Sequence, residues 1–167
     1  MKVIFLDIDG VLATNKQFFT NTANFWKKNE WARELKVPYP FDKGCVDIFN
    51  SILEQTDAEI VLSSDWKLHW DLIDLDTIFK ENGVNKSPRF LTKNEDVSMT
   101  WIERNRAYQI GMFIQDFNIT DYVVIDDLDL HSFMETRGDD KNFIQTRSDM
   151  GLKQQNIKEK IIKVLTK

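Results

Sequence analysis

Cysteine, histidine and proline are scarce in this chain. Its 167 residues include one cysteine, two histidines and three prolines. A single cysteine, Cys45, excludes an internal disulfide framework and suits a reducing compartment. Cys45 falls on the apolar face of its predicted helix, so we expect a packed thiol rather than a nucleophile. His69 and His131 have no histidine or cysteine partner at ligand spacing, which favours surface or capping roles over a zinc site.

Long apolar runs and compositional breaks are also missing. No segment approaches the roughly 20 apolar residues that span a bilayer. The apolar run at the N-terminus is too short for a signal peptide, so we expect a cytoplasmic protein without membrane contact. No linker rich in proline, glycine or serine divides the chain, which predicts a single domain over residues 1–167. The net charge of −5 gives no general attraction to nucleic acid but is compatible with a local basic groove.

The first twelve residues carry the strongest pattern, MKVIFLDIDGVL. Residues 1–6 are apolar and β-branched or aromatic, which is typical of a strand buried on both faces. Asp7 and Asp9 are two residues apart, so strand geometry would place both carboxylates on one side at the carboxyl end of that strand. Gly10 allows a sharp turn there. Two carboxylates this close repel each other unless a cation or a proton intervenes, and the pattern therefore predicts a metal.

Strands and helices alternate along the rest of the chain. Further buried strands are predicted at 59–62, 121–125 and 143–146, with a short one at 89–91. Asp42 is expected to cap the helix that precedes the second strand, and Thr100 and Glu103 to form a capping box. This alternation predicts a parallel α/β sheet, whose strand ends bring Ser63, Asp126 and Asp127 close to Asp7.

Residues 13–42 interrupt this alternation. They are polar and aromatic, and residues 22–35 could form a helix. We expect the segment to be a small cap that passes over the active edge of the sheet. Its aromatic side chains either pack on the core or face the substrate as a stacking surface.

Four ordered motifs of the haloacid dehalogenase (HAD) superfamily resemble patterns in this chain. They are Asp7-Ile8-Asp9-Gly10-Val11-Leu12, Ser63 after the second strand, a basic residue before the acidic strand, and Asp126-Asp127 at its end. The stretch IVLSSDWK at 60–67, Arg106 with Ile110, and Thr146 with Gly151-Leu152 are similar to HAD domains associated with nucleic-acid repair proteins. That branch more often reads SSSWR where this chain has SSDWK.

The resemblance implies a three-layer Rossmann-like (HAD-like) parallel sheet with helices on both faces and a small cap insertion after the first strand. It also implies a phosphatase in which Asp7 is the nucleophile, Asp9 the acid and base, Ser63 a ligand of the phosphoryl group and Arg106 its counter-charge. Mg²⁺ would be held by Asp7, the main-chain carbonyl of Asp9 and Asp126, with Asp127 in the metal site as an outer partner rather than a direct ligand.

Several alternatives stay open at this point. Arg104 and Lys93 compete with Arg106 as the basic motif residue. The substrate could be a phosphorylated nucleic-acid end, a nucleotide or a small metabolite such as a sugar phosphate. The chain could also be a non-catalytic module that binds phosphate and metal, since fold alone does not establish activity. The sequence does not indicate an oligomeric state.

Overall fold

Five parallel strands form one sheet in the order β3-β2-β1-β4-β5. The structure is a computed structural model and describes residues 1–93 and 102–167. The strands are β1 (Lys2–Leu6), β2 (Glu59–Leu62), β3 (Phe90–Leu91), β4 (Asp121–Asp126) and β5 (Phe143–Gln145). Every predicted strand is present, and its ends lie within one residue of the prediction. The α/β class with a parallel sheet is therefore confirmed.

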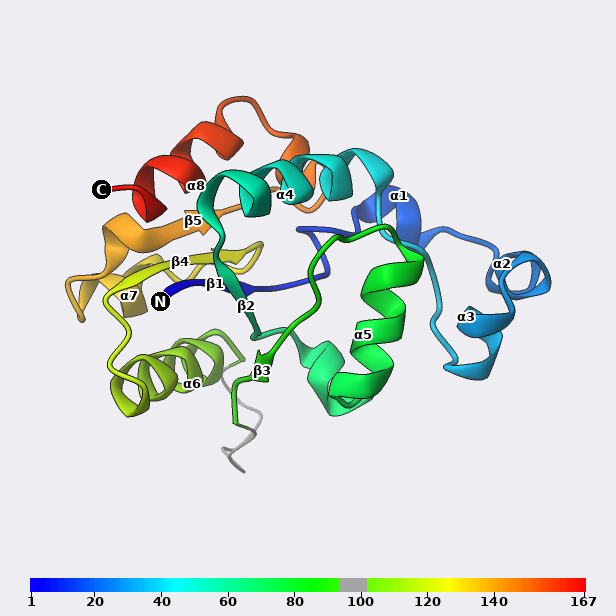
Figure 1. Cartoon of the computed structure of the whole chain (residues 1–167), viewed down its shortest axis with the longest axis horizontal. Helices are drawn as coiled ribbons and strands as arrows, with labels where there is room; N and C mark the ends of the chain where they lie inside the picture. Colours follow the sequence, from blue (N-terminus) through cyan, green and yellow to red (C-terminus); the bar gives the residue numbers. More distant parts are fainter. Residues whose placement is uncertain (94–101) are drawn as a thin grey trace.

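Helices cover both faces of this sheet, with α4 and α8 above it and α6 below it in Figure 1. On β1, Ile4 and Leu6 belong to one buried cluster and Val3 and Phe5 to the other, because successive side chains of a strand point to opposite faces. The longer helices are α4 (Lys43–Thr56), α5 (Leu72–Glu81), α6 (Ile102–Asp116) and α8 (Ile157–Leu165). The short ones are α7 (His131–Glu135), η1 (Asp65–Leu68), η2 (Asp140–Asn142) and η3 (Gly151–Lys153). The three-layer arrangement is confirmed.

The segment between β1 and α4 forms three short helices, α1 (Asn15–Phe18), α2 (Thr22–Lys28) and α3 (Glu30–Glu34). In Figure 1 α2 and α3 project from the sheet on the side of α5. The helical character expected over 22–35 is present, but in two pieces, because Asn29 has an extended backbone between α2 and α3. Its side chain donates a hydrogen bond to the carbonyl of Phe25, a local contact typical of asparagine at helix ends.

The helix before β4 buries Ala107 and Ile110. Phe117 follows the end of α6 at Asp116 and is 50% exposed. Phe113 takes the inner position, and the ring of Phe117 stacks on it with centroids 4.4 Å apart. The predicted capping box includes Thr100, which lies outside the described residues.

Cys45 is buried within α4, and burial raises the pKa of its thiol to about 11, as expected of a packed cysteine. Both histidines are exposed. None of the helices in the described ranges has the length and apolar character required to cross a bilayer.

Asp42 begins α4 as predicted. Its carboxylate accepts a hydrogen bond from the backbone N–H of Cys45 at 3.1 Å and another from Nζ of Lys153 at 2.7 Å. Burial alone would raise the pKa of Asp42, but these hydrogen bonds outweigh burial and lower it. One side chain thus caps α4 and fastens it to η3.

We expect Asp42→Ala to lower the free energy of unfolding by about 1–2 kcal/mol, because the cap and the ion pair are both lost. Asp42→Asn keeps an oxygen that can cap the helix, so its free energy of unfolding should fall by less. Since the folded pKa of Asp42 lies below its unfolded value of about 3.9, the ionised form stabilises the protein above that pH and this contribution disappears as the pH falls further. Denaturant titrations at several pH values check this. If the free energy of unfolding differs between wild type and Asp42→Asn by as much at pH 3 as at pH 7, the prediction is contradicted.

Candidate active site

Asp7 and Asp126 lie side by side at the carboxyl ends of the central strand β1 and its neighbour β4. The backbone N–H of Asp7 still donates to the carbonyl of Ile125 at 3.0 Å, so the pairing of β1 with β4 continues up to the site. Oxygen atoms of Asp7, Asp126 and Asp127 all lie within 4.8 Å of one another. Asp7 and Asp126 are buried.

Burial raises the pKa of Asp7 well above its ordinary value, and the charge of Asp126 raises it further, whereas Arg106 opposes the shift. Burial also raises the pKa of Asp126, again against the effect of Arg106. The donor set consists of oxygens alone, which suits a hard divalent cation such as Mg²⁺. The group therefore fits the expected metal, with Asp7, Asp126 and Asp127 as the carboxylates that could hold it.

Arg106 is the cation that the structure brings to these carboxylates. It is buried, and its Nη1 lies 3.2 Å from Oδ1 of Asp7 and 3.0 Å from Oδ2 of Asp126. Its Nη2 contacts Oδ1 of Asp65 at 3.1 Å. A small pocket of about 210 Å³ at this point is lined by four aspartates and by Arg106. The acidic charge in the pocket exceeds what one guanidinium balances, which leaves negative charge for a further cation.

The carboxylate of Asp9 faces two hydrogen-bond donors instead of the acidic group. The hydroxyl of Tyr39 donates to its Oδ1 at 2.8 Å, and Nε1 of Trp66 donates to its Oδ2 at 3.1 Å. Burial raises the pKa of Asp9, and these two hydrogen bonds oppose the rise. Asp7 and Asp9 line the same pocket, so the structure brings the expected nucleophile and acid together. Metal binding by the main-chain carbonyl of Asp9 stays a prediction.

The loop that carries Asp9 is held by the C-terminal part of the chain. Thr146 donates its hydroxyl to the carbonyl of Gly10 at 2.8 Å, and the backbone N–H of Leu152 donates to the carbonyl of Val11 at 3.2 Å. At Gly151 a side chain would overlap the carbonyl of Val11. The C-terminal residues of the sequence resemblance thus fix the turn that follows Asp7.

Two serines follow β2, and they differ in their contacts. The hydroxyl of Ser63 is buried and has no hydrogen-bond partner within residues 1–93 and 102–167. The hydroxyl of Ser64 accepts a hydrogen bond from the backbone N–H of Trp66 at 3.4 Å, and Ser64 lines the acidic pocket, where it helps to lower the pKa of Asp7. The role expected of Ser63 stays a prediction, and Ser64 is a site residue that sequence reasoning missed.

Lys67 is a second buried cation behind the site. Its Nζ donates to Thr92 Oγ1, to Gln109 Oε1 at 2.6 Å and to the carbonyl of Ser63 at 3.4 Å. Burial lowers the pKa of Lys67 to about 8, and Arg106 adds to that effect. Lys67 stands where the related branch more often has arginine, and here it joins η1 to α6, the helix that carries Arg106.

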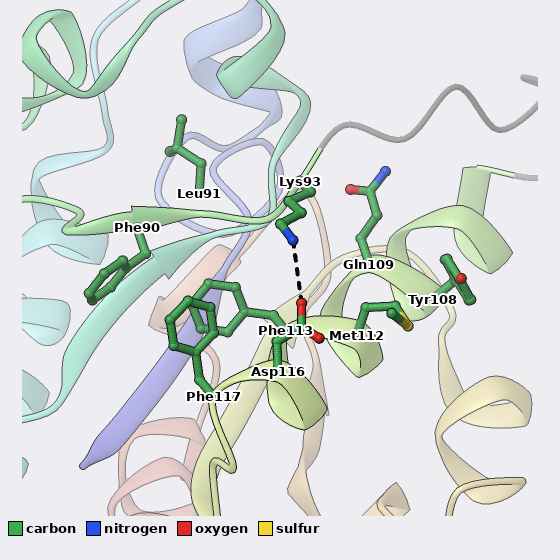
Figure 2. Close-up of a pocket in the computed structure, with 9 residues that line it drawn as sticks. All are labelled: Phe90, Leu91, Lys93, Tyr108, Gln109, Met112, Phe113, Asp116 and Phe117. Carbon is green, nitrogen blue, oxygen red and sulfur yellow. Dashed lines mark hydrogen bonds and ion pairs between the residues drawn. The ribbon is translucent and has the colours of Figure 1, made fainter.

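Of the rival basic residues, Lys93 lies away from the acidic group. Figure 2 shows Lys93 at a separate pocket of about 150 Å³ between β3 and α6, where it pairs with Asp116 at 3.5 Å. The side chain of Arg104 lies outside the described part of the chain. Between Lys93 and Arg106, the placement of Arg106 agrees with the expected role, and the prediction for Arg104 stays untested.

The aromatic residues of α2 and α3 pack against the core. Phe25, Trp26 and Trp31 are partly buried against the larger core cluster, and Nε1 of Trp26 donates to the carbonyl of Val37 at 2.7 Å. Between the two alternatives for these rings, the structure therefore supports packing. A different aromatic surface, formed by Tyr39, Trp66 and Trp70, lies next to Asp9.

Comparison with known proteins agrees with this geometry. A family model described as the HAD domain in Swiss Army Knife RNA repair proteins matches residues 3–157. The chain belongs to this family. Membership confirms the resemblance to HAD domains of nucleic-acid repair and implies a phosphohydrolase-type function for this HAD domain. Searches of curated proteins and of solved structures gave no match.

Several functional residues were not predicted from the sequence. Ser64 and Asp65 directly follow the strand that ends at Leu62, so the rule that ligands gather at strand ends could have found them. Tyr39 lies 30 residues from Asp9 in the chain, in a segment without a strand pattern, and no local signal points to it.

Gly10 has a φ of +76°, and a methyl group there would overlap the carboxylate of Asp127. Gly83 has a φ of +81° but open space around it, so Gly83→Ala serves as a control for backbone strain alone. We expect Gly83→Ala to lower the free energy of unfolding by about 1–2 kcal/mol and Gly10→Ala to lower it further, because Asp127 must move. Chemical denaturation of both variants measures the difference. Equal losses would show that Asp127 does not approach Gly10 closely.

Proposed function

We propose that this HAD domain is a Mg²⁺-dependent phosphatase that forms an aspartyl-phosphate on Asp7 and acts on phosphorylated nucleic-acid or nucleotide ends. The main support for this proposal is that two neighbouring aspartates have different hydrogen-bond and ion-pair partners. Asp7 lies in the acidic group beside Arg106, whereas Asp9 is held outside it by Tyr39 and Trp66. A nucleophile and a proton donor need this division of roles.

In the first half-reaction a carboxylate oxygen of Asp7 attacks the phosphorus atom while the bond to the leaving oxygen breaks. Asp9 gives its proton to that oxygen, so the product leaves as an alcohol. Arg106 and a hydroxyl from Ser63 or Ser64 offset the charge on the phosphoryl oxygens, which is where negative charge is greatest in phosphoryl transfer.

In the second half-reaction Asp9, now deprotonated, takes a proton from water as the water attacks the phosphorus atom of the aspartyl-phosphate. The bond between phosphorus and the Asp7 oxygen breaks, phosphate is released and Asp9 is protonated again. The two hydrogen bonds from Tyr39 and Trp66 keep the carboxylate oriented through both steps. When bound, Mg²⁺ would reduce the repulsion between the anionic nucleophile and the anionic phosphate.

The family description supports a nucleic-acid end as the substrate, since the related HAD domains occur in RNA repair proteins. The two dedicated donors on Asp9 favour an enzyme over a binding module, because a module that only holds phosphate has no use for an oriented proton donor.

Removal of the divalent cation should abolish activity. With excess EDTA we expect hydrolysis of an aryl phosphate to fall by more than about 100-fold and to return when Mg²⁺ is added, because the charge of the buried carboxylates is then balanced again. A colorimetric rate assay measures this. Undiminished turnover in EDTA would contradict the metal-dependent mechanism.

The two aspartates should fail in different ways. Asp7→Asn should form no covalent phosphoenzyme on rapid quenching with a radiolabelled phosphate ester, because the nucleophile is gone. Asp9→Asn should lose about 100-fold or more in the rate of the first step with an alkyl phosphate and less with an aryl phosphate, whose leaving group hardly needs a proton.

Asp129→Asn is the matched control for both variants, since Asp129 is an exposed aspartate just beyond β4. It should behave as wild type. Equal losses of Asp9→Asn with the two leaving groups would rule out Asp9 as the acid, and a phosphoenzyme in Asp7→Asn would rule out Asp7 as the nucleophile.

A further inference from the structure

A cleft of about 480 Å³ opens directly beside the acid residue Asp9. It lies between the segment that follows α3 and the residues of η1, and its walls include the rings of Tyr39, Trp66 and Trp70. Asp9 and Asp65 line both this cleft and the smaller acidic pocket, so the two spaces adjoin. The cleft has more than twice the volume of the acidic pocket.

The position of Asp9 determines what the cleft can hold. In the proposed reaction Asp9 gives its proton to the leaving oxygen, so that oxygen lies next to the Asp9 carboxylate. The group attached to the oxygen must then extend away from Asp7 and past Tyr39 and Trp66. The cleft on that side is therefore the site of the leaving group, and this step rests on the proposed function.

The walls of the cleft suit a flat aromatic group. The centroids of Trp66 and Trp70 are 4.7 Å apart, and those of Tyr39 and Trp66 are 6.0 Å apart. Nε1 of Trp70 donates to the carbonyl of Leu35 at 2.8 Å, which fixes the ring before any ligand arrives. Rings fixed in this way stack on nucleobases whatever their identity, whereas a sugar phosphate offers no flat face.

Lys36 supplies positive charge at the same cleft. Its side chain is exposed and forms no ion pair with any described residue. A strand that places its terminal base against these aromatic walls carries its next phosphodiester outward, toward solvent. An unpaired lysine at the rim complements that charge.

We propose that this cleft binds the terminal nucleoside of a single-stranded nucleic acid, with the base against Trp70 and the adjoining phosphodiester near Lys36. The protein thus selects a strand end over a sugar phosphate through its leaving group. Tyr39 and Trp66 serve two purposes, because they orient Asp9 and also line the nucleoside site.

The test compares Trp70→Leu, which removes the ring, with Trp70→Phe, which keeps an aromatic surface. Binding of a fluorescein-labelled trinucleotide with a terminal 3′-phosphate is followed by anisotropy in the Asp7→Asn background, where turnover is blocked. We expect Trp70→Leu to bind about tenfold more weakly and Trp70→Phe to lose about threefold or less, in line with the usual effect of one stacked base. Thermal melts establish that both variants are folded.

A charge variant keeps the proposal testable if Trp70→Leu does not fold. Lys36→Gln should weaken binding of the trinucleotide. It should also make the slope of log affinity against log salt shallower by about 0.7, the value for one phosphate contact on a single strand. Lys160→Gln is the matched control, since Lys160 is exposed on α8 and is not among the residues that line the cleft. It should retain the wild-type slope.

Competition and turnover separate this proposal from the proposed function. A nucleoside 3′-monophosphate should displace the labelled strand at lower concentration than ribose 5-phosphate, and Trp70→Leu should lower the ratio of kcat/KM for the trinucleotide to kcat/KM for acetyl phosphate about tenfold. Equal competition, or equal binding by Trp70→Leu and Trp70→Phe, would overturn the nucleoside site even if acetyl phosphate is hydrolysed. If no phosphate ester is hydrolysed, the proposed function fails and the binding titrations still decide the cleft.

Discussion

Repulsion between buried carboxylates at the centre of the sheet is the constraint on which the site depends. Asp7 and Asp126 end adjacent parallel strands, so the backbone pairing of β1 with β4 forces them together whatever their charge. Arg106 relieves part of this repulsion from α6, and the negative charge that remains can attract a cation. The pairing of the strands thus fixes these charged groups in position before a phosphate ester binds.

The parts of this site that could be predicted are those that the sheet places. Asp7, Asp126 and Asp127 follow buried strands, and strand ends of a parallel sheet meet at one edge, so their proximity followed from periodicity alone. Arg106 was predicted through its motif, and its buried contacts agree with that role. The hydrophobic pattern does not define where α6 ends. The helix stops at Asp116, and Phe117, the next residue, is therefore half exposed.

The parts that could not be predicted depend on the path of residues 13–42. The apolar residues of this segment do not recur at the spacing of a strand or of a long helix. Asn29 divides its helical part into α2 and α3. Trp26 and Trp31 were equally suited by type to stacking and to packing, and only their positions against the core distinguish the two. Tyr39 and Trp70 each contact Trp66 and line one cleft, and no short sequence window contains these residues together.

The two hydrogen bonds on Asp9 come from separate elements, Tyr39 from the segment after α3 and Trp66 from η1. The insertion after β1 also lines the cleft beside Asp9, through residues that include Lys36 and Tyr39. The same insertion supplies the Tyr39 hydroxyl that orients Asp9, the proposed proton donor. A grafted insertion would therefore have to carry an equivalent hydroxyl to the same point, so recognition and chemistry in this protein must change together.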